Sequence, residues 1–173
     1  MSVETIAAAM GFSAAQSLAL EQTCIRFGVV TPLQHAHFLA QVAHESGAGR
    51  YMEEIASGAA YEGRADLGNT QPGDGVRFKG RGLIQLTGRT NYARYSSSLY
   101  QDYRCMRNPE MLAELPDAAL AAGWFWKSKG LNAPAELDNI EAVTRKINGG
   151  TNGLEDRKKR LAQAKKLIAE MAL

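Results

Sequence analysis

A glycine-rich segment interrupts a chain that otherwise has helical periodicity, and this break limits the possible folds more than any other feature. Seven glycines lie between residues 58 and 82 among polar residues and Pro72. Because glycine and proline disfavour regular helix, the segment predicts irregular chain or a short hairpin, not helix. Long glycine-rich insertions in compact domains are uncommon and are more often functional than accidental.

Before this segment the chain has strong helix signals. Ser13 is placed to cap a helix that stops at Gly28. Thr31 followed by Pro32 then begins a helix that should run to about Ser46, with apolar residues at three- and four-residue steps. The glycines that follow leave Glu45 in its last turn.

Helical patterns return after the glycine-rich segment. We expect helices over residues 91–99 and 117–129, a short turn at Asn108-Pro109, a helix capped by Asp138 that ends at 148–150, and a last helix from about Leu154. One face of the last helix carries Leu161, Ala164, Ile168 and Met171, and its basic residues, Arg157 among them, lie mostly elsewhere. The fold predicted is a helical body with a small lobe at about residues 50–90, and a cleft where the two meet.

Length and composition are those of one globular domain. The chain has 173 residues, 45% hydrophobic content and a net charge of +2, which gives no support for a nucleic-acid partner. It lacks both the run of roughly 18 apolar residues that a membrane span needs and a recognisable export signal. Cys24 and Cys105 have no metal-type or redox-type spacing and are expected to be free thiols.

Two carboxylates flank the junction between the predicted helix and the lobe. Glu45 rises from a buried helix, and Glu54 lies in the polar segment that follows. Glycosidic cleavage needs such a pair, one in a dry environment with a raised pKa as general acid and one ionised as base. A continuous helix would separate residues 45 and 54 by about 13–14 Å. Gly47 and Gly49 permit a bend, so the pair can reach the roughly 6.5–9.5 Å that an inverting mechanism needs.

Other chemistries have weaker support. His44-Glu45 resembles the start of a zinc helix motif, but Ala48 occupies the place of its second histidine. His35, His37 and His44 have no cysteine or acidic residue obviously placed to complete a metal site. The chain also has no Gly-x-Ser-x-Gly motif for a serine nucleophile.

Residues 77–87 combine charge, glycine and amide groups. On an extended segment Gln85 and Thr87 share one face and can line a cleft, while Ile84 and Leu86 pack behind them. Five aromatic residues flank these positions and are candidates to lie against sugar faces, although most aromatics in any domain belong to the core: Tyr51, Tyr61, Phe78, Tyr92 and Tyr95. Trp124 and Trp126, in a helical run, are expected to be packing residues.

Several motifs together resemble a known family. They are Ala43-His44-Glu45-Ser46, Tyr61-Glu62-Gly63-Arg64, Asp66-Leu67-Gly68-Asn69, residues 80–89 with Asn91-Tyr92, Ile147-Asn148-Gly149-Gly150 and Asp156-Arg157. With these motifs the chain resembles glycoside hydrolase family 19, the chitinase family to which many phage endolysins also belong. The resemblance implies a mainly α, lysozyme-like α+β fold of two lobes and an inverting mechanism.

The resemblance also implies roles for individual residues. Glu45 is the implied general acid, Glu54 the general base, and Thr87 helps to hold the attacking water. Plant-type members place a longer segment between the two glutamates, so Glu53 and Glu62 remain rivals for the base. The expected substrate-contacting or carboxylate-orienting residues are His44, Tyr61, Gln85, Asn91, Tyr92, Asn148 and Arg157.

The function expected is that of an endolysin that cleaves the β-1,4 bonds of bacterial peptidoglycan for host cell lysis. A chitinase acting on N-acetylglucosamine polymers is the nearest alternative. A domain that binds glycan without catalysis, or that binds acidic surfaces through its basic C-terminal helix, is the alternative of another class.

The expected organisation is simple. Residues 1–173 form one catalytic domain without a separate wall-binding module, cofactor or metal, and act as a monomer. We expect no nucleic-acid partner and no stable membrane insertion. The protein is expected to be made in the host cytoplasm and to reach the wall after a holin-type protein permeabilises the membrane.

Overall fold

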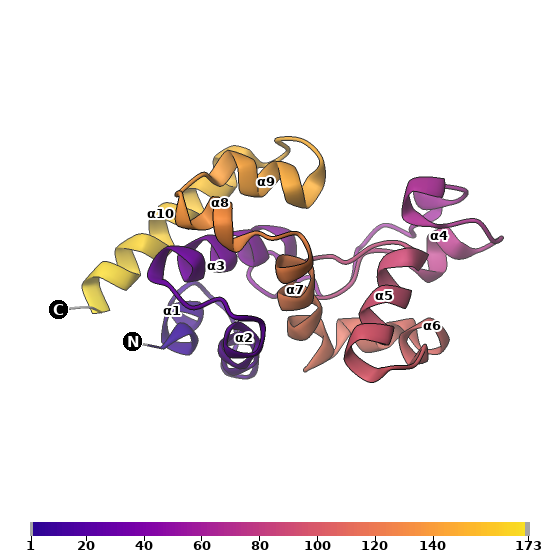
Figure 1. Cartoon of the computed structure of the whole chain (residues 1–173), viewed down its shortest axis with the longest axis horizontal. Coiled ribbons are helices and arrows are strands. Elements are labelled where there is room, and N and C mark those ends of the chain that lie inside the picture. The colour runs from indigo at the N-terminus through magenta and orange to yellow at the C-terminus, as the bar shows by residue number, and fades with distance from the viewer. Residues whose placement is uncertain (1, 172–173) are drawn as a thin grey trace.

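The computed structural model describes residues 2–171, which are mainly helical (Figure 1). The α-helices are α1 Val3–Ala9, α2 Ala14–Phe27, α3 Pro32–Ser46, α4 Asp74–Arg77, α5 Arg89–Tyr100, α6 Arg104–Arg107, α7 Asp117–Ser128, α8 Asn132–Glu136, α9 Ile140–Asn148 and α10 Leu154–Met171. Three 3-10 turns are η1 Ala59–Tyr61, η2 Ala65–Leu67 and η3 Pro109–Ala113. The mainly α fold predicted from the sequence is confirmed. No helix within residues 2–171 is long and apolar enough to cross a membrane.

The helices form two lobes. Figure 1 shows α1, α2, α3, α8, α9 and α10 together at one end, α4, α5 and α6 at the other, and α7 between them. In the body α3 packs against α10, and α2 packs against both α1 and α7. The connections between α3 and α5 and between α6 and α7 therefore pass from one lobe to the other.

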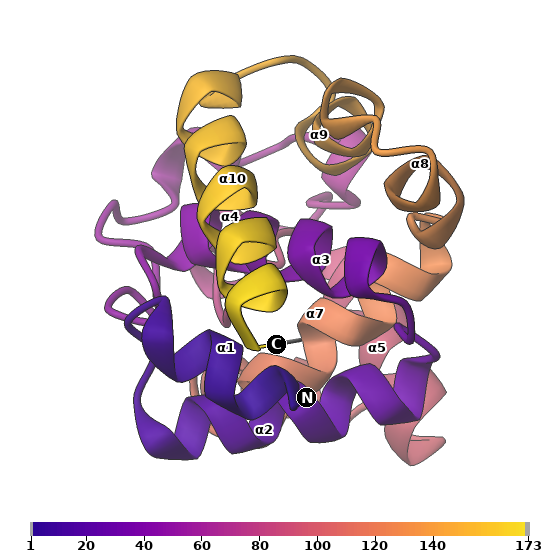
Figure 2. The same cartoon turned by 90° about the vertical axis from the view of Figure 1, so that its left-hand side faces the viewer.

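Helix α3 is the centre of the body. Thr31 caps its first turn in a reciprocal capping box with Gln34, and Pro32 occupies the first helical position. The helix ends at Gly47, which has the left-handed φ of 58° that favours glycine. Figure 2 shows α3 with α1 and α2 on one side and α8 and α9 on the other. The predicted bounds of this helix, and the position of Glu45 in its last turn, are confirmed.

The glycine-rich segment is more ordered than predicted. It contains η1, η2 and the single helical turn α4, so the expectation of irregular chain without helix is wrong there. Its extended pairing is limited to isolated bridges that join Arg81 to Glu53 and to Leu86. Asp74 explains the local order, because its carboxylate is buried and accepts hydrogen bonds from Gln71 N and from the Arg89 guanidinium.

The Asp74–Arg89 pair makes the stability of the small lobe dependent on pH. The hydrogen bonds from Arg89 hold the pKa of Asp74 below its ordinary value of 3.8. A lowered pKa in the folded state adds stability above the unfolded pKa, and this stability is lost as the pH falls through the folded pKa. We expect Asp74→Asn to be about 1–3 kcal/mol less stable than wild type near neutral pH. It should also lose less stability than wild type between about pH 5 and pH 3.

Urea unfolding across this pH range measures the difference. Asp66→Asn is the control. The hydrogen bond from Arg64 also lowers the pKa of Asp66, but both side chains are exposed, so screening by solvent should make the change in acid dependence much smaller than that of Asp74→Asn. An acid dependence of Asp74→Asn that is as steep as wild type would contradict the expectation.

Two expectations about the C-terminal helices are wrong. Asn139, not Asp138, caps α9, since Asp138 accepts hydrogen bonds from His37 and Lys165 instead. Arg157 lies on the buried face of α10, with Leu161 and Ala164, because groups on α3 satisfy its guanidinium. Met171, at the end of α10, is 37% exposed.

Both cysteines are buried and unpaired. Burial raises the pKa of the Cys24 thiol and of the Cys105 thiol. A thiol held in its neutral form is a poor nucleophile, so neither cysteine is a candidate for covalent catalysis.

Candidate active site

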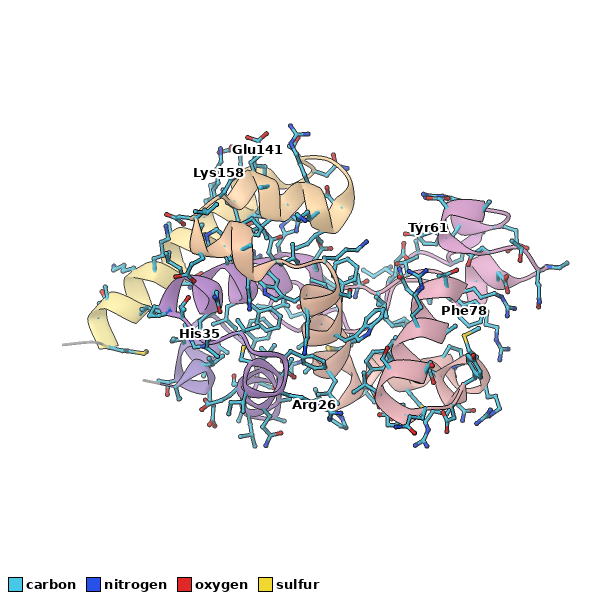
Figure 3. The ribbon with its side chains drawn as sticks, viewed as in Figure 1. Arg26, His35, Tyr61, Phe78, Glu141 and Lys158 are labelled. Atoms are coloured by element: carbon cyan, nitrogen blue, oxygen red, sulfur yellow. The ribbon has the colours of Figure 1, made fainter. Side chains whose placement is uncertain are left out.

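One cavity of about 340 Å³ is lined by both lobes. The body contributes Glu45, Phe125, Ile147 and Asn148. The small lobe and the loop that leads into it contribute Tyr61, Arg64, Leu67, Ile84, Gln85, Leu86, Thr87 and Asn91. In Figure 3, Tyr61 lies on the side of the small lobe that faces the body. This cavity brings together most of the residues that the sequence singled out.

Glu45 enters the cavity from the end of α3. Its side chain is 18% exposed and its Oε1 accepts a hydrogen bond from Arg157 Nη2 at 2.6 Å. The sequence predicted a dry setting for this carboxyl. The structure gives a mostly buried carboxyl whose partner is a guanidinium, because α10 packs on α3 with Arg157 facing inward.

Gln85 and Thr87 reach the cavity from a tight loop, not from the extended segment that the sequence predicted. The Arg81 and Leu86 backbones exchange hydrogen bonds at 3.2 and 2.9 Å and so close the loop. Gly82 has a φ of 77°, and a β-carbon there would lie 2.8 Å from the Leu112 carbonyl oxygen. Only glycine fits this point of the loop without strain. As predicted, Ile84 and Leu86 are buried, although both also form part of the cavity wall.

Hydrogen bonds fix the polar side chains of this wall. Thr87 Oγ1 donates to the Gln85 carbonyl oxygen at 2.9 Å, and Asn91 Nδ2 donates to the Thr87 carbonyl oxygen at 2.9 Å. Gln85 Nε2 donates to the carbonyl oxygens of Tyr51 and Gly82. The Gln85 side-chain amide therefore ties the loop to the chain that leaves α3.

Glu54 lies beside this loop. Its Oε1 accepts a hydrogen bond from the Tyr61 hydroxyl at 2.9 Å, and its Oε2 accepts one from Gly80 N at 3.1 Å. Glu54 N donates to the Gly80 carbonyl oxygen at 2.8 Å, which holds residue 54 next to residue 80. Gly47 and Gly49 both have positive φ, so the chain bends after α3 as the sequence predicted. Glu54 does not itself line the 340 Å³ cavity, but its partner Tyr61 does.

Several oxygen atoms converge at Gly80. A β-carbon on Gly80 would lie 3.3 Å from Glu54 Oε2, 3.3 Å from Thr87 Oγ1 and 3.0 Å from Gln85 Oε1. Three polar side chains therefore point at one place beside the Gly80 backbone. This arrangement suits the binding of one small polar molecule between a carboxylate and a hydroxyl group.

The two rival carboxylates have other partners. Glu53 pairs with Arg81 at 3.0 Å and with Lys79 at 3.1 Å. Partial burial raises the pKa of Glu53, but these two cations outweigh it and lower that pKa overall. Glu62 accepts hydrogen bonds from the backbone N–H groups of Gly73 and Gly75, which places it in the scaffold of the lobe.

Some predicted contact residues do not reach the cavity. Tyr92 is fully buried, and its hydroxyl donates to the Lys79 carbonyl oxygen at 2.6 Å, so it supports the loop from behind. Phe78 and Tyr95 are likewise core residues. The His44 ring is held by Asp156 at 2.6 Å and lies outside the cavity lining. Arg157 acts on the cavity only through Glu45.

Several cavity residues could not be expected from their sequence patterns. Arg64 and Leu67 lie within the family motifs, but those motifs gave no role for either side chain. Phe125 and Ile147 read as ordinary apolar positions of helices α7 and α9, and only the packing of the two lobes brings them to the site. A larger cavity of about 740 Å³ lies in the small lobe between α4 and α6, and Phe78 is the one predicted contact residue among those that line it.

The histidines are dispersed. His35 bonds to the Val29 carbonyl oxygen, His37 to Asp138 and His44 to Asp156. Burial lowers the pKa of His35 and of His37. Within the residues that the structure describes, no group of three or more His, Cys, Asp or Glu side chains is placed to hold a metal ion.

Comparison with known proteins identifies the family. No family model matches the chain. A glycosyl hydrolase family 19 domain-containing protein of Haemophilus influenzae is 35% identical over 162 residues, a match that covers 75% of this chain and 78% of that protein. The chain belongs to glycosyl hydrolase family 19. The family that the motifs suggested is therefore confirmed, and this family 19 protein is a glycoside hydrolase.

Other family 19 proteins share the sequence or the fold. An endochitinase from Arabidopsis thaliana is 36% identical over 145 residues, which cover 82% of this chain and 49% of the plant protein. The chain thus spans about half the length of that plant relative. Chitinase C from Streptomyces griseus has the same fold, with a TM-score of 0.74 at 22% identity, covering 96% of this chain and 91% of that one. A second bacterial family 19 chitinase gives a TM-score of 0.70 at 21% identity, covering 95% and 93% of the two chains.

Proposed function

We propose that this family 19 enzyme hydrolyses, by an inverting mechanism, the β-1,4 bond between N-acetylmuramic acid and N-acetylglucosamine in peptidoglycan strands, which leaves N-acetylmuramic acid at the new reducing end. The observation that carries the proposal is the convergence of Glu54, Thr87 and Gln85 at Gly80, because Thr87 and Gln85 also line the cavity that Glu45 lines. An inverting glycosidase needs one carboxyl to protonate the leaving oxygen and a second carboxylate with room for a water molecule.

The roles follow from these positions. Glu45 donates a proton to the glycosidic oxygen as the bond from that oxygen to the anomeric carbon breaks. Glu54 accepts a proton from a water molecule held beside Gly80 by Thr87 Oγ1, and the oxygen of this water attacks the anomeric carbon from the opposite face. The products are a leaving-group hydroxyl and a sugar with inverted anomeric configuration, and each carboxyl group is restored by exchange with solvent.

The proposed substrate is peptidoglycan because of Arg64. This arginine is half-exposed on the cavity wall and also pairs with Asp66. The peptide stems of peptidoglycan carry carboxylates that a guanidinium can bind, whereas chitin is uncharged. The proposed biological role is that of an endolysin, which reaches the wall after a holin-type protein opens the membrane. This role rests on the motif resemblance alone.

Chitin is the second candidate substrate, because the plant relatives are endochitinases. Release of reducing ends by wild type and by Glu45→Gln should be measured on purified peptidoglycan and on colloidal chitin. We expect wild type to release them from peptidoglycan and Glu45→Gln to release almost none. Release from chitin alone would select the chitinase, and no release from either polymer would indicate a protein that only binds glycan.

Gly80→Ala tests the proposed water position. Gly80 is not among the positive-φ glycines, so alanine strains the backbone little. Its methyl group would press on the oxygens of Glu54, Thr87 and Gln85 at 3.0–3.3 Å. Misplacement of reacting groups by about 1 Å can lower rates by about 10²-fold, so we expect kcat to fall by about 10-fold or more with little change in Tm.

Gly150→Ala is the matched control. Gly150 also lacks a positive φ, and a β-carbon there would meet only Asn148 Oδ1, at 3.9 Å. Near wild-type kcat is expected for this variant. Equal activity of Gly80→Ala and Gly150→Ala would argue against a water site at Gly80.

A further inference from the structure

Gln41 is a fully buried polar residue on the same helix as Glu45, one turn earlier. Its side-chain amide has partners at both ends. Oε1 accepts a hydrogen bond from Arg157 Nη1 of α10, and Nε2 donates to Thr144 Oγ1 of α9 at 3.3 Å. A chain of hydrogen bonds thus runs from α9 through Gln41 to Arg157 and on to Glu45.

Arg157 has a buried charge, since its side chain is 2% exposed. Its three nitrogen atoms bond to Gln41, to Glu45 and to the Asn152 carbonyl oxygen. Within residues 2–171, Glu45 is the one carboxylate that pairs with this guanidinium. Gln41 therefore accepts a hydrogen bond from Arg157 without neutralising the positive charge, which remains available to Glu45. An amide can do this, whereas a carboxylate or an apolar group cannot.

We propose that Gln41 is a positioning residue that, anchored by Thr144, fixes Arg157 so that Glu45 presents its carboxyl to the cavity. The proposal rests on the acid role of Glu45 described above. When Glu45 turns toward the glycosidic oxygen, Arg157 keeps two neutral partners and stays in place. Without Gln41 the guanidinium would have one fewer partner and would bind Glu45 more tightly, in competition with the substrate.

Other charged groups surround this chain and bear on its pH dependence. His44 precedes Glu45 on α3 and bonds to Asp156 of α10, which also pairs with Arg160. Arg64 faces the cavity from the small lobe. Gln41→Met leaves all of these groups unchanged and adds no titratable group, so a shift in its pH profile can be attributed to Arg157 and Glu45.

The test compares Gln41→Met and Gln41→Glu with wild type on soluble, uncross-linked peptidoglycan strands. We expect Gln41→Met to lower kcat by about 10- to 100-fold with KM nearly unchanged, because misplacement affects the reacting group and not the binding of the glycan. Gln41→Glu adds a second carboxylate opposite Arg157. The added negative charge favours the protonated form of Glu45. The fall of kcat/KM on the alkaline side of its pH profile should therefore move to higher pH by about one unit. In Gln41→Met that fall should move to lower pH.

Gln34→Met is the matched control. Gln34 is a second buried glutamine of α3, but its side chain accepts hydrogen bonds from Val30 N and Thr31 N and donates to Glu136, away from the cavity. This variant should lower Tm without moving the pH profile. If both Gln41 variants change Tm but keep the wild-type kcat and pH profile, Gln41 is only a packing residue and the proposal is overturned.

Thr144→Val and Glu45→Gln distinguish a failure of the Gln41 proposal from a failure of the proposed acid role. If Gln41→Glu fails to fold, Thr144→Val tests the same chain from its other end, because it removes the acceptor for Gln41 Nε2. A fall in kcat at unchanged KM is then expected, and a wild-type kcat would overturn the proposal. Failure of the proposed acid role would appear separately, as undiminished activity of Glu45→Gln.

Discussion

Glu45→Gln is expected to lower kcat on peptidoglycan by about 10²- to 10⁴-fold, which is the usual contribution of a general acid. Glutamine has nearly the shape of glutamic acid and can still accept the hydrogen bond from Arg157, but it cannot give a proton to the leaving oxygen. The variant should therefore fold and bind glycan strands with little change in KM. Reducing-end release measures kcat and KM, and circular dichroism shows whether the variant is folded.

Three further glutamates control for this variant and distinguish the candidate bases. Glu54→Gln should also lose most of its activity. Glu62→Gln should keep activity and lose stability, because Glu62 binds the backbone of Gly73 and Gly75. Glu53→Gln should lose stability through its contacts with Lys79 and Arg81. Full activity of Glu54→Gln with loss of activity in Glu53→Gln or Glu62→Gln would transfer the role of base to that residue.

Arg157→Met should destabilise the protein by about 3–5 kcal/mol, the usual effect of removing one partner from a buried ion pair. Methionine fills similar space, but it leaves the Glu45 carboxylate and the Gln41 amide without their donor. Arg157→Lys should recover only part of the loss, because a single ammonium group cannot copy the geometry of a guanidinium that binds three acceptors. Urea unfolding near neutral pH gives the free energies.

Arg160→Met is the control on the same helix. Arg160 is 23% exposed on its side chain and pairs with Asp156, so we expect a loss of about 1 kcal/mol or less. The double variant Glu45→Gln with Arg157→Met removes both charges and should be more stable than the sum of the single variants implies. Equal losses of unfolding free energy for Arg157→Met and Arg160→Met would show that the buried pair contributes no more stability than the more exposed pair.

The parts of the fold that local signals determine could be predicted. Thr31 followed by Pro32 marked the start of α3, and Gly47 marked its end. The burial of Arg157 could not be predicted, because charged residues normally lie outside the core and its side-chain partners Gln41 and Glu45 are more than 100 positions away. Helix α4 was also missed, because its Asp74 is satisfied by Arg89 of another helix, a contact that the local sequence pattern does not show.

Part of the candidate site could also be predicted from the sequence, and part could not. Residue type and motif pointed to Glu45, Gln85 and Thr87, and the structure brings all three to one cavity. Spacing could not distinguish the three candidate bases, because each is held by residues of a later segment. Glu54 bonds to Gly80, Glu53 pairs with Lys79 and Arg81, and Glu62 bonds to Gly73 and Gly75. Tyr92 looked like a sugar contact, but its hydroxyl supports the loop from inside the lobe.

Mass spectrometry of borohydride-reduced fragments from purified peptidoglycan tests most directly whether Glu45 drives cleavage of the glycan strand. Wild type should release fragments that end in reduced N-acetylmuramic acid, and Glu45→Gln should release none above the enzyme-free level. Fragments that end in reduced N-acetylglucosamine, or the same fragments from wild type and Glu45→Gln, would contradict the proposed reaction.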